Sequence, residues 1–171
     1  PDKTSFRSLR KYIRLEDKWI LSKIEDLKND VKDAMDYFNV HLACRVLDRF
    51  ILEDLSRWYV RLLRDRTWIE GESPDKLAVH KTLHEVLLTL ANLMAPFTPH
   101  IAEEIYQNLD GKQATIFMSP QIKYDKSLVN IELNQQMDIA REIVERVHSA
   151  RQKAGIKLRW PVKLIAIKAQ T

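Results

Sequence analysis

The residues that could carry out catalysis or bind a metal are few and far apart in this sequence. His80 and His84 are four positions apart, which suits two metal ligands on one helix face, but no third ligand lies near them. Cys44 is interpreted as a small core residue rather than a nucleophile. Glu103 and Glu104 are adjacent, so on a helix their carboxylates point about 100° apart and cannot face one substrate. We therefore expect no catalytic residue and no metal site in this chain.

Sequence signatures of nucleotide-binding and hydrolytic sites are also missing. The chain has only three glycines, and no P-loop, Gly-x-Gly-x-x-Gly or Gly-x-Ser-x-Gly motif occurs in it. His84-Glu85 is not followed by the second histidine of a zinc-protease helix. These absences favour a binding role for the chain.

A first candidate binding surface combines arginines with a tryptophan. Arg57, Arg61, Arg64 and Trp68 follow one another at spacings of four, three and four, which places them on one face of a helix. Guanidinium groups bind phosphates and stack on bases, and an exposed indole stacks on an unpaired base. The alternative is that the arginines form ion pairs with nearby carboxylates and that Trp68 packs in the core. The sequence leaves both interpretations open.

A second candidate surface follows the last predicted helix. Arg151 and Lys153 precede Gly155, and an extended segment with further cations and Trp160 comes after it; the proposed contacts are Arg151, Lys153, Lys157, Arg159 and Trp160. In an extended segment, positions 157 and 159 share one side, while 156, 158 and 160 share the other. We expect the basic side to meet phosphates and the apolar side to dock; the cations could instead complement the helix C-terminus.

The charge distribution agrees with a polyanionic partner. The net charge is +4, yet residues 141–171 contain eight Lys/Arg and two Asp/Glu, a local net charge of +6. A local basic excess of this kind attracts nucleic acid, although a solvated helix face with ordinary lysines would look similar.

Periodic apolar residues predict the elements that position these side chains. Helices are expected over 15–38, 39–69, 73–95, 98–111 and 130–155, with Ser73-Pro74 and Thr98-Pro99 as start signals. The first should bury a stripe ending in Met35 and Phe38, and the second a stripe of Leu47, Ile51, Leu55, Trp58 and Leu62. Residues 114–118 and 162–169 are β-prone and predict short extended pieces.

These elements predict a mainly α fold. Long helices with short connections favour an antiparallel bundle of about five helices, with a minor β segment near the C-terminus. We expect residues 1–155 to form the bundle and residues 156–171 to begin a further extended segment.

Composition places the chain among soluble globular proteins. Apolar residues make up 45% and charged residues 30% of it. No transmembrane segment or signal peptide is expected, and the single cysteine suits a reducing compartment such as the cytoplasm. Because the chain begins at Pro1, we interpret it as a piece of a longer protein.

Four stretches resemble the helical anticodon-binding domain of class I aminoacyl-tRNA synthetases for branched aliphatic amino acids. They are LEDKWILSK at 15–23, EDLSRWY at 53–59, MAPFTPHIAEEIY at 94–106 and RQKAGIKLRWPV at 151–162. The second resembles the isoleucyl form, and the fourth is similar to the segment that closes this domain in isoleucyl enzymes of the archaeal and eukaryotic type. Ser119-Pro120 departs from the Trp-Pro that the family often has there. The catalytic signatures His-Ile-Gly-His and Lys-Met-Ser-Lys-Ser do not occur in the chain.

This resemblance implies a partner and a role. The parent enzyme would join isoleucine to tRNA(Ile) with ATP and Mg²⁺, while this piece, which needs no cofactor and lacks catalytic residues, would hold the anticodon stem and loop beside catalytic and C-terminal domains of the same polypeptide. The nine residues of the two candidate surfaces would make the RNA contacts. The alternatives are the same domain of a valyl-, leucyl- or methionyl-tRNA synthetase, or a helical protein-interaction domain that uses Arg and Trp as hot spots.

Overall fold

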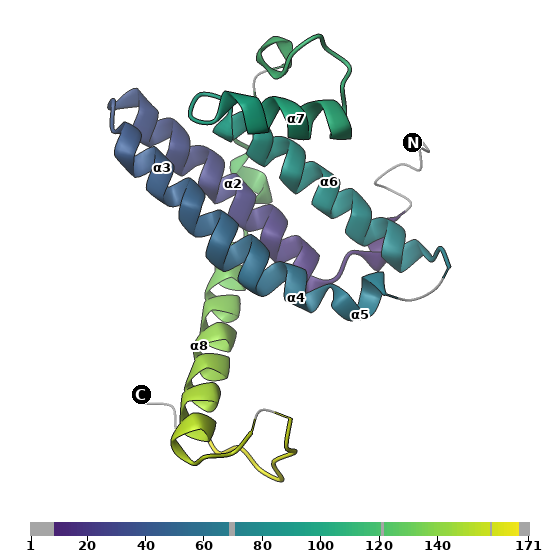
Figure 1. Ribbon diagram of the computed structural model, residues 1–171, viewed down its shortest axis with the longest axis vertical. Helices are drawn as coiled ribbons and strands as arrows, with labels where there is room; N and C mark the ends of the chain where they lie inside the picture. Colours follow the sequence, from purple (N-terminus) through teal and green to yellow (C-terminus); the bar gives the residue numbers. More distant parts are fainter. Residues whose placement is uncertain (1–8, 69–70, 121, 158, 168–171) are drawn as a thin grey trace. The chain divides into compact units, whose positions relative to one another are not determined.

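The computed structural model describes residues 9–68, 71–120, 122–157 and 159–167 of the chain (Figure 1). The chain divides into two compact units, Pro1–Asn130 and Ile131–Thr171. The predicted division after residue 155 stays a prediction.

The first unit is built from antiparallel helices. Helix α2 (Leu15–Asp36) packs against α3 (Val40–Arg49) and against α6 (Pro74–Met94), and α6 packs against α7 (Pro99–Leu109) (Figure 1). Short turns join α2 to α3 and α6 to α7, and a short connection forces neighbouring helices to run in opposite directions. The prediction of a mainly α, antiparallel bundle is confirmed.

The helix starts agree with the signals in the sequence. The Ser73 hydroxyl accepts a hydrogen bond of 3.1 Å from the backbone N–H of Lys76, and Pro74 occupies the first helical position of α6. Pro99 begins α7 in the same way, although Thr98 makes no side-chain cap. At the start of α2, the Asp17 carboxylate accepts a hydrogen bond of 2.9 Å from the Arg14 backbone N–H. These caps fix where the helices begin.

The second predicted helix is continuous but not regular. After α3 it continues as a π-helix, η2 (Phe50–Tyr59), and as the short α4 (Val60–Leu62) and α5 (Arg64–Thr67). A π-helix bonds residue i to i+5, so its buried face recurs at a longer interval than in an α-helix.

This irregularity corrects the predicted buried stripe of the second helix. Ile51 and Trp58 are only half-buried and Leu62 is exposed. Leu47 and Leu55 are buried as predicted, and the other buried apolar positions are Phe50, Tyr59 and Leu63. Phe50 and Leu55, two successive buried apolar residues, are five positions apart. A pattern with 3.6 residues per turn does not predict this spacing.

The core of the first unit lies between α2 and its neighbours. Trp19, Ile20 and Ile24 of α2 are almost completely buried. A second cluster, at the α6–α7 junction, contains Ala91, Ala95, Ala102, Tyr106 and Ile116. The prediction that Phe38 completes the α2 stripe is wrong, because α2 ends at Asp36 and the Phe38 ring is 90% exposed.

The predicted β segments are not found among the described residues. Within 114–118 the chain forms a 3₁₀ turn, η3 (Ile116–Met118), rather than an extended strand. Residues 162–167 have no strand structure, and 168–169 lie outside the described residues. A strand requires a backbone partner, and in the second unit the apolar side chains of 162–167 instead line a groove beside Ile143 and Val147 of α8 (Ile131–Lys153).

Two further 3₁₀ turns occur in the first unit, η1 (Arg10–Tyr12) before α2 and η4 (Lys126–Leu128) after α7. No helix in the described parts of the chain has the length and apolar character needed to cross a membrane.

Candidate nucleic-acid interface

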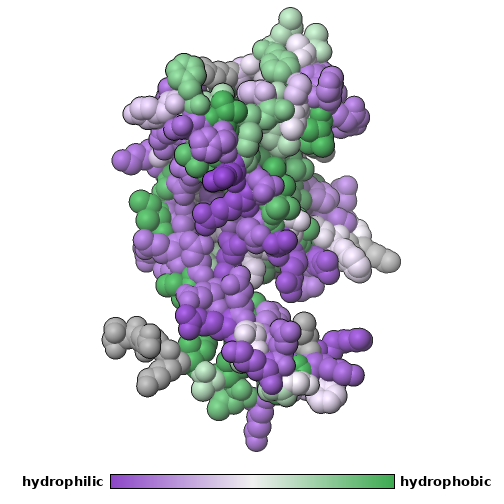
Figure 2. All heavy atoms as spheres, turned by 60° about the vertical axis from the view of Figure 1, so that its left-hand side comes forward, coloured by the Kyte–Doolittle hydropathy of each residue, from purple (hydrophilic) through white to green (hydrophobic). Residues whose placement is uncertain are grey.

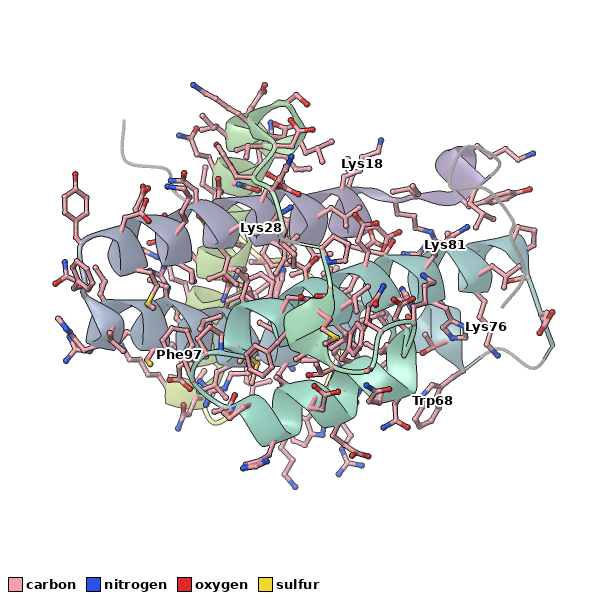
Figure 3. The ribbon with its side chains drawn as sticks, turned by 90° about the horizontal axis from the view of Figure 1, so that it is seen from above. Lys18, Lys28, Trp68, Lys76, Lys81 and Phe97 are labelled. Carbon is pink, nitrogen blue, oxygen red and sulfur yellow. The ribbon has the colours of Figure 1, made fainter. Side chains whose placement is uncertain are left out.

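The structure places the first candidate surface on the solvent side of the second helix. Arg57 lies midway between buried Leu55 and Tyr59, and Arg61 lies midway between Tyr59 and Leu63, so both point away from the core. Arg64 is also exposed. The indole of Trp68 follows α5 and is 84% exposed, projecting from the edge of the molecule in Figure 3. The interpretation of Trp68 as a core residue is excluded by this exposure.

The three arginines differ in their partners. Arg57 forms an ion pair with Glu53, one turn earlier; the Arg57 side chain is 67% exposed and that of Glu53 is 42% exposed. The side chains of Arg61 and Arg64 form no hydrogen bond or ion pair with any residue that the structure describes. An exposed pair is weak and easily exchanged, so Arg57 can still change partner, while Arg61 and Arg64 offer full positive charges to a polyanion.

A fourth arginine, Arg66, is buried where the other three are exposed. Only 3% of the Arg66 side chain is accessible, and it lies among carboxylates from two other helices. It donates hydrogen bonds of 2.9–3.0 Å to Asp17 and 3.0 Å to Glu16 of α2, and of 2.8 Å to Asp75 of α6. Burial alone would lower the pKa of Arg66, but its hydrogen bonds to Asp75 and Asp17 raise that pKa above its ordinary value.

Tyr59 completes this buried network. Its hydroxyl donates a hydrogen bond of 2.7 Å to Asp17, and burial together with the Asp17 charge raises the pKa of Tyr59 far above its ordinary value. Arg14 adds a second ion pair to Asp75, at 2.8 Å. The network ties the end of the second helix to the starts of α2 and α6. It therefore fixes the direction in which Arg64 and Trp68 project.

Sequence reasoning missed Arg66, although a signal was available. Arg66 follows Tyr59 and Leu63 at helical spacings of four and three, on the side that points into the core. An arginine on a buried face requires carboxylate partners, and Asp17 lies just before the apolar run that begins at Trp19.

The second candidate surface belongs to the second unit. Helix α8 ends at Lys153, and Gly155 follows with a φ of +67°, as its role as a helix stop predicts. Arg151 donates hydrogen bonds from Nη2 to the backbone oxygens of Lys157 (2.6 Å) and Trp160 (2.5 Å). Arg151 thus holds the segment that follows the helix.

The remaining candidates of this segment are exposed. Lys153, Lys157 and Arg159 all face solvent, and Trp160 is 58% exposed. The apolar side of the segment was expected to pack against the protein. Ile156 is half-buried, in agreement with this expectation, whereas Trp160 is exposed. Leu158 lies outside the described residues. The segment presents cations and an indole in an accessible position.

His84 and Glu103, two of the residues considered for metal binding or catalysis, make structural contacts. The described residues include no group of three His, Cys, Asp or Glu side chains that could hold a metal ion. His84 Nε2 lies 3.1 Å from the backbone oxygen of Leu109. Cys44 is exposed, so the prediction that it is a core residue is wrong: neighbouring Ala43 takes the buried position.

Glu103 anchors the loop after α7. Its carboxylate accepts hydrogen bonds of 2.6 Å from Gln107, 2.9 Å from the Ile116 backbone N–H and 2.8 Å from the Thr115 hydroxyl. These bonds, that of Gln107 first, lower the pKa of Glu103. Glu103 therefore holds the segment at 115–116 against α7.

Comparison with known proteins agrees with this arrangement. Residues 17–166 match the family described as the anticodon-binding domain of tRNA ligase. The chain is 47% identical, over 99% of its length, to the isoleucine–tRNA ligase of Methanocella arvoryzae, and 44% identical, over its full length, to that of Methanosarcina barkeri. It is 50% identical to the Pyrococcus furiosus isoleucine–tRNA ligase over 92% of its length.

The chain covers 15–17% of the length of these three relatives. Its helices, its exposed arginines and the match over nearly the whole sequence lead to one conclusion. The chain belongs to the family of anticodon-binding domains of tRNA ligases.

Proposed function

We propose that this chain is the part of an isoleucine–tRNA ligase that binds the anticodon arm of tRNA(Ile). The observation that carries the proposal is the 44–50% identity, along nearly the whole chain, to isoleucine–tRNA ligases. Bases of an anticodon loop are unstacked and accessible, whereas the stem is recognised mainly through its backbone and shape. The domain therefore needs cations for phosphates and flat side chains for bases.

In the first unit, Arg61 and Arg64 are the proposed phosphate ligands. Neither has a partner among the described residues, so binding an RNA phosphate breaks no ion pair of theirs. Arg57 joins them by exchanging Glu53 for a phosphate, and the exposed indole of Trp68 stacks on an unpaired base.

In the second unit, Lys153, Lys157 and Arg159 are the proposed phosphate ligands, and Trp160 is a second stacking residue. Arg151 contributes by holding the backbone at Lys157 and Trp160, which limits how far this segment can move. Phosphate contacts would set the position of the tRNA, and base contacts would provide its identity.

The proposed parent enzyme uses ATP and Mg²⁺ to activate isoleucine. The chain contains neither His-Ile-Gly-His nor Lys-Met-Ser-Lys-Ser, the class I signatures for ATP, so its residues do not fit that role. ATP and Mg²⁺ would bind to a catalytic domain elsewhere in the polypeptide. The work of this chain is to position the tRNA so that its distant acceptor end reaches that domain.

A nuclease footprint tests the proposal directly. The 171-residue chain is mixed with tRNA(Ile) at low salt, and the protected nucleotides are mapped. Protection of the anticodon loop and the adjoining stem is the expected result. Protection confined to the acceptor arm would contradict the proposal. So would the absence of any protection by the chain at a concentration at which the full-length enzyme protects tRNA(Ile).

A further inference from the structure

The turn between α2 and α3 contains a residue in a conformation that its side chain disfavours. Phe38 has a φ of +58°, the only positive φ among the described residues other than glycine. A bulky side chain in this left-handed region is a genuine outlier, because its Cβ crowds the backbone. Such strain persists only where the surrounding structure imposes the conformation, and strained residues cluster at functional sites.

The hydrogen bonds of the turn show which residue would be comfortable there. The N–H of Phe38 donates to Met35 O (3.0 Å), and the N–H of Asn39 donates to Ala34 O (2.8 Å). These two bonds form the Schellman motif that ends many helices, and its left-handed position is normally a glycine. Phe38 occupies the glycine position of α2.

The end of α8 provides an internal comparison. There the N–H of Gly155 donates to Gln152 O (3.1 Å) and the N–H of Ile156 donates to Arg151 O (3.0 Å), the same pattern of bonds around a φ of +67°. At that helix end the chain has the glycine that the motif favours. The motif itself requires the positive φ, and a glycine adopts that φ without strain. The strain at Phe38 therefore comes from the phenylalanine side chain.

Packing of the Phe38 ring does not offset this strain. It is 90% exposed, and the neighbouring Tyr37 ring is 78% exposed. The turn lies at one end of the α2–α3 pair in Figure 1, and Figure 2 shows hydrophobic side chains exposed towards the upper end of the face on which it lies. An exposed aromatic ring held outward at a cost in strain is available to a ligand.

A cation near the turn favours RNA as that ligand, and Asp36, two positions before Phe38, is already paired with Lys32. Arg45 lies two positions from both buried Ala43 and buried Leu47, so it points to solvent, and it has no partner among the described residues. It comes about 8 Å along the helix axis from the start of α3. An aromatic ring with a nearby unpaired cation is the combination that binds a base and its phosphate.

We propose that the α2–α3 turn is a further RNA contact, in which Phe38 stacks on an unpaired base of the bound tRNA and Arg45 meets a neighbouring phosphate. The inference rests on the proposed function and extends it to a part of the domain remote in sequence from Arg57 and Trp68. Stacking is tolerant of base identity. The contact therefore strengthens binding without selecting a sequence.

Phe38→Gly provides a test in which stability and binding change in opposite directions. Because glycine is unstrained at this φ, the variant should unfold at an equal or higher urea concentration than the unsubstituted chain. Its Kd for tRNA(Ile) should nevertheless rise by about tenfold, which is within the range for one lost base stack. Phe38→Trp should bind at least as tightly as the unsubstituted chain.

Leu128→Ala is the control, since Leu128 is 55% exposed in η4, beside a segment that bonds to Ser22 in the first half of α2 rather than to the turn. It should leave the Kd unchanged. If Phe38→Gly binds tRNA(Ile) as tightly as the unsubstituted chain, Phe38 is not a stacking residue and a protein partner becomes the better occupant. If the unsubstituted chain binds no tRNA, the proposed function fails as well.

Discussion

Individual arginines in this domain have opposite physical roles although they lie close together in sequence. Arg66 is buried among carboxylates, Arg57 forms an exposed pair with Glu53, and Arg61 and Arg64 have no partner among the described residues. A charge that is already neutralised must first lose its partner before it can bind a phosphate. The residues without partners are therefore the ones whose loss should weaken RNA binding most.

Arg61→Ala should weaken binding of tRNA(Ile) by removing one phosphate contact. The slope of log Kd against log salt concentration should fall by about 1, because one fewer counterion is released. Titrations at several salt concentrations measure this slope. Arg57→Ala is the matched control and should weaken binding less. If Arg57→Ala weakens binding more than Arg61→Ala does, Arg61 is not the stronger phosphate ligand.

Glu103 gives the fold a dependence on pH. Its pKa is lowered by hydrogen bonds from Gln107, the Ile116 backbone and Thr115. A carboxyl with a depressed pKa stabilises the folded chain above its unfolded pKa, near 4.5, and this contribution is lost as the pH falls through the lower, folded value.

Glu103→Gln should therefore reduce the loss of stability between neutral and acidic pH. Urea unfolding of the variant and of the unsubstituted chain at pH 7 and below pH 4 measures the difference. Glu104→Gln is a suitable control, since Glu104 bonds to Asn108 within its own helix. An unchanged pH dependence in Glu103→Gln would mean that the loop anchor contributes nothing to stability.

At the scale of elements, the end of the second helix is held by a buried ionic network rather than by apolar packing alone. Arg66 joins α5 to Asp17 of α2 and Asp75 of α6, and Tyr59 bonds to the same Asp17. Removing one member of a buried ion pair leaves the other charge unpaired, which costs more than the pair itself contributes.

Arg66→Ala should destabilise the chain by about 3–5 kcal/mol, the typical cost of leaving a buried carboxylate such as Asp17 without its partner. Arg57→Ala, which removes an exposed pair, should cost less than about 1 kcal/mol. Urea denaturation gives both values. Equal effects of the two substitutions would show that the network does not hold the helix end.

The sequence predicted the positions of the helices better than their internal geometry. Pro74 and Pro99 begin helices as expected, because capping depends on a few local residues. The buried face of the second helix was mispredicted at Ile51, Trp58 and Leu62, because periodicity assumes 3.6 residues per turn and the π-helical stretch does not keep that period. The minor β segment was predicted from β-propensity, which does not provide the strand with a partner.

The candidate interface was predictable only in part. The exposure of Arg61, Arg64 and Trp68 follows from helical spacing. The loop contacts of Arg151 depend on backbone oxygens brought together beyond Gly155, and the strained exposure of Phe38 depends on where α2 ends. Neither of these features is carried by a sequence pattern.

At the scale of the whole molecule, the proposed contacts come from both units. Arg61 and Arg64 lie in the first unit; Lys153, Lys157 and Arg159 lie in the second, within the part of the chain whose net charge is +6. If all five cations reach phosphates, raising the salt concentration from about 50 to 200 mM should weaken binding of tRNA(Ile) by about 100-fold. Binding that is insensitive to salt would favour a protein-interaction domain.

The most direct test of the account compares two RNAs that differ only in the anticodon. The Kd of the 171-residue chain is measured at low salt for tRNA(Ile) and for the same tRNA carrying the anticodon of another amino acid. We predict that tRNA(Ile) binds more tightly by about tenfold or more, the discrimination that one base-edge contact provides. Equal affinity for the two RNAs, or no binding of either, would contradict anticodon recognition by this chain.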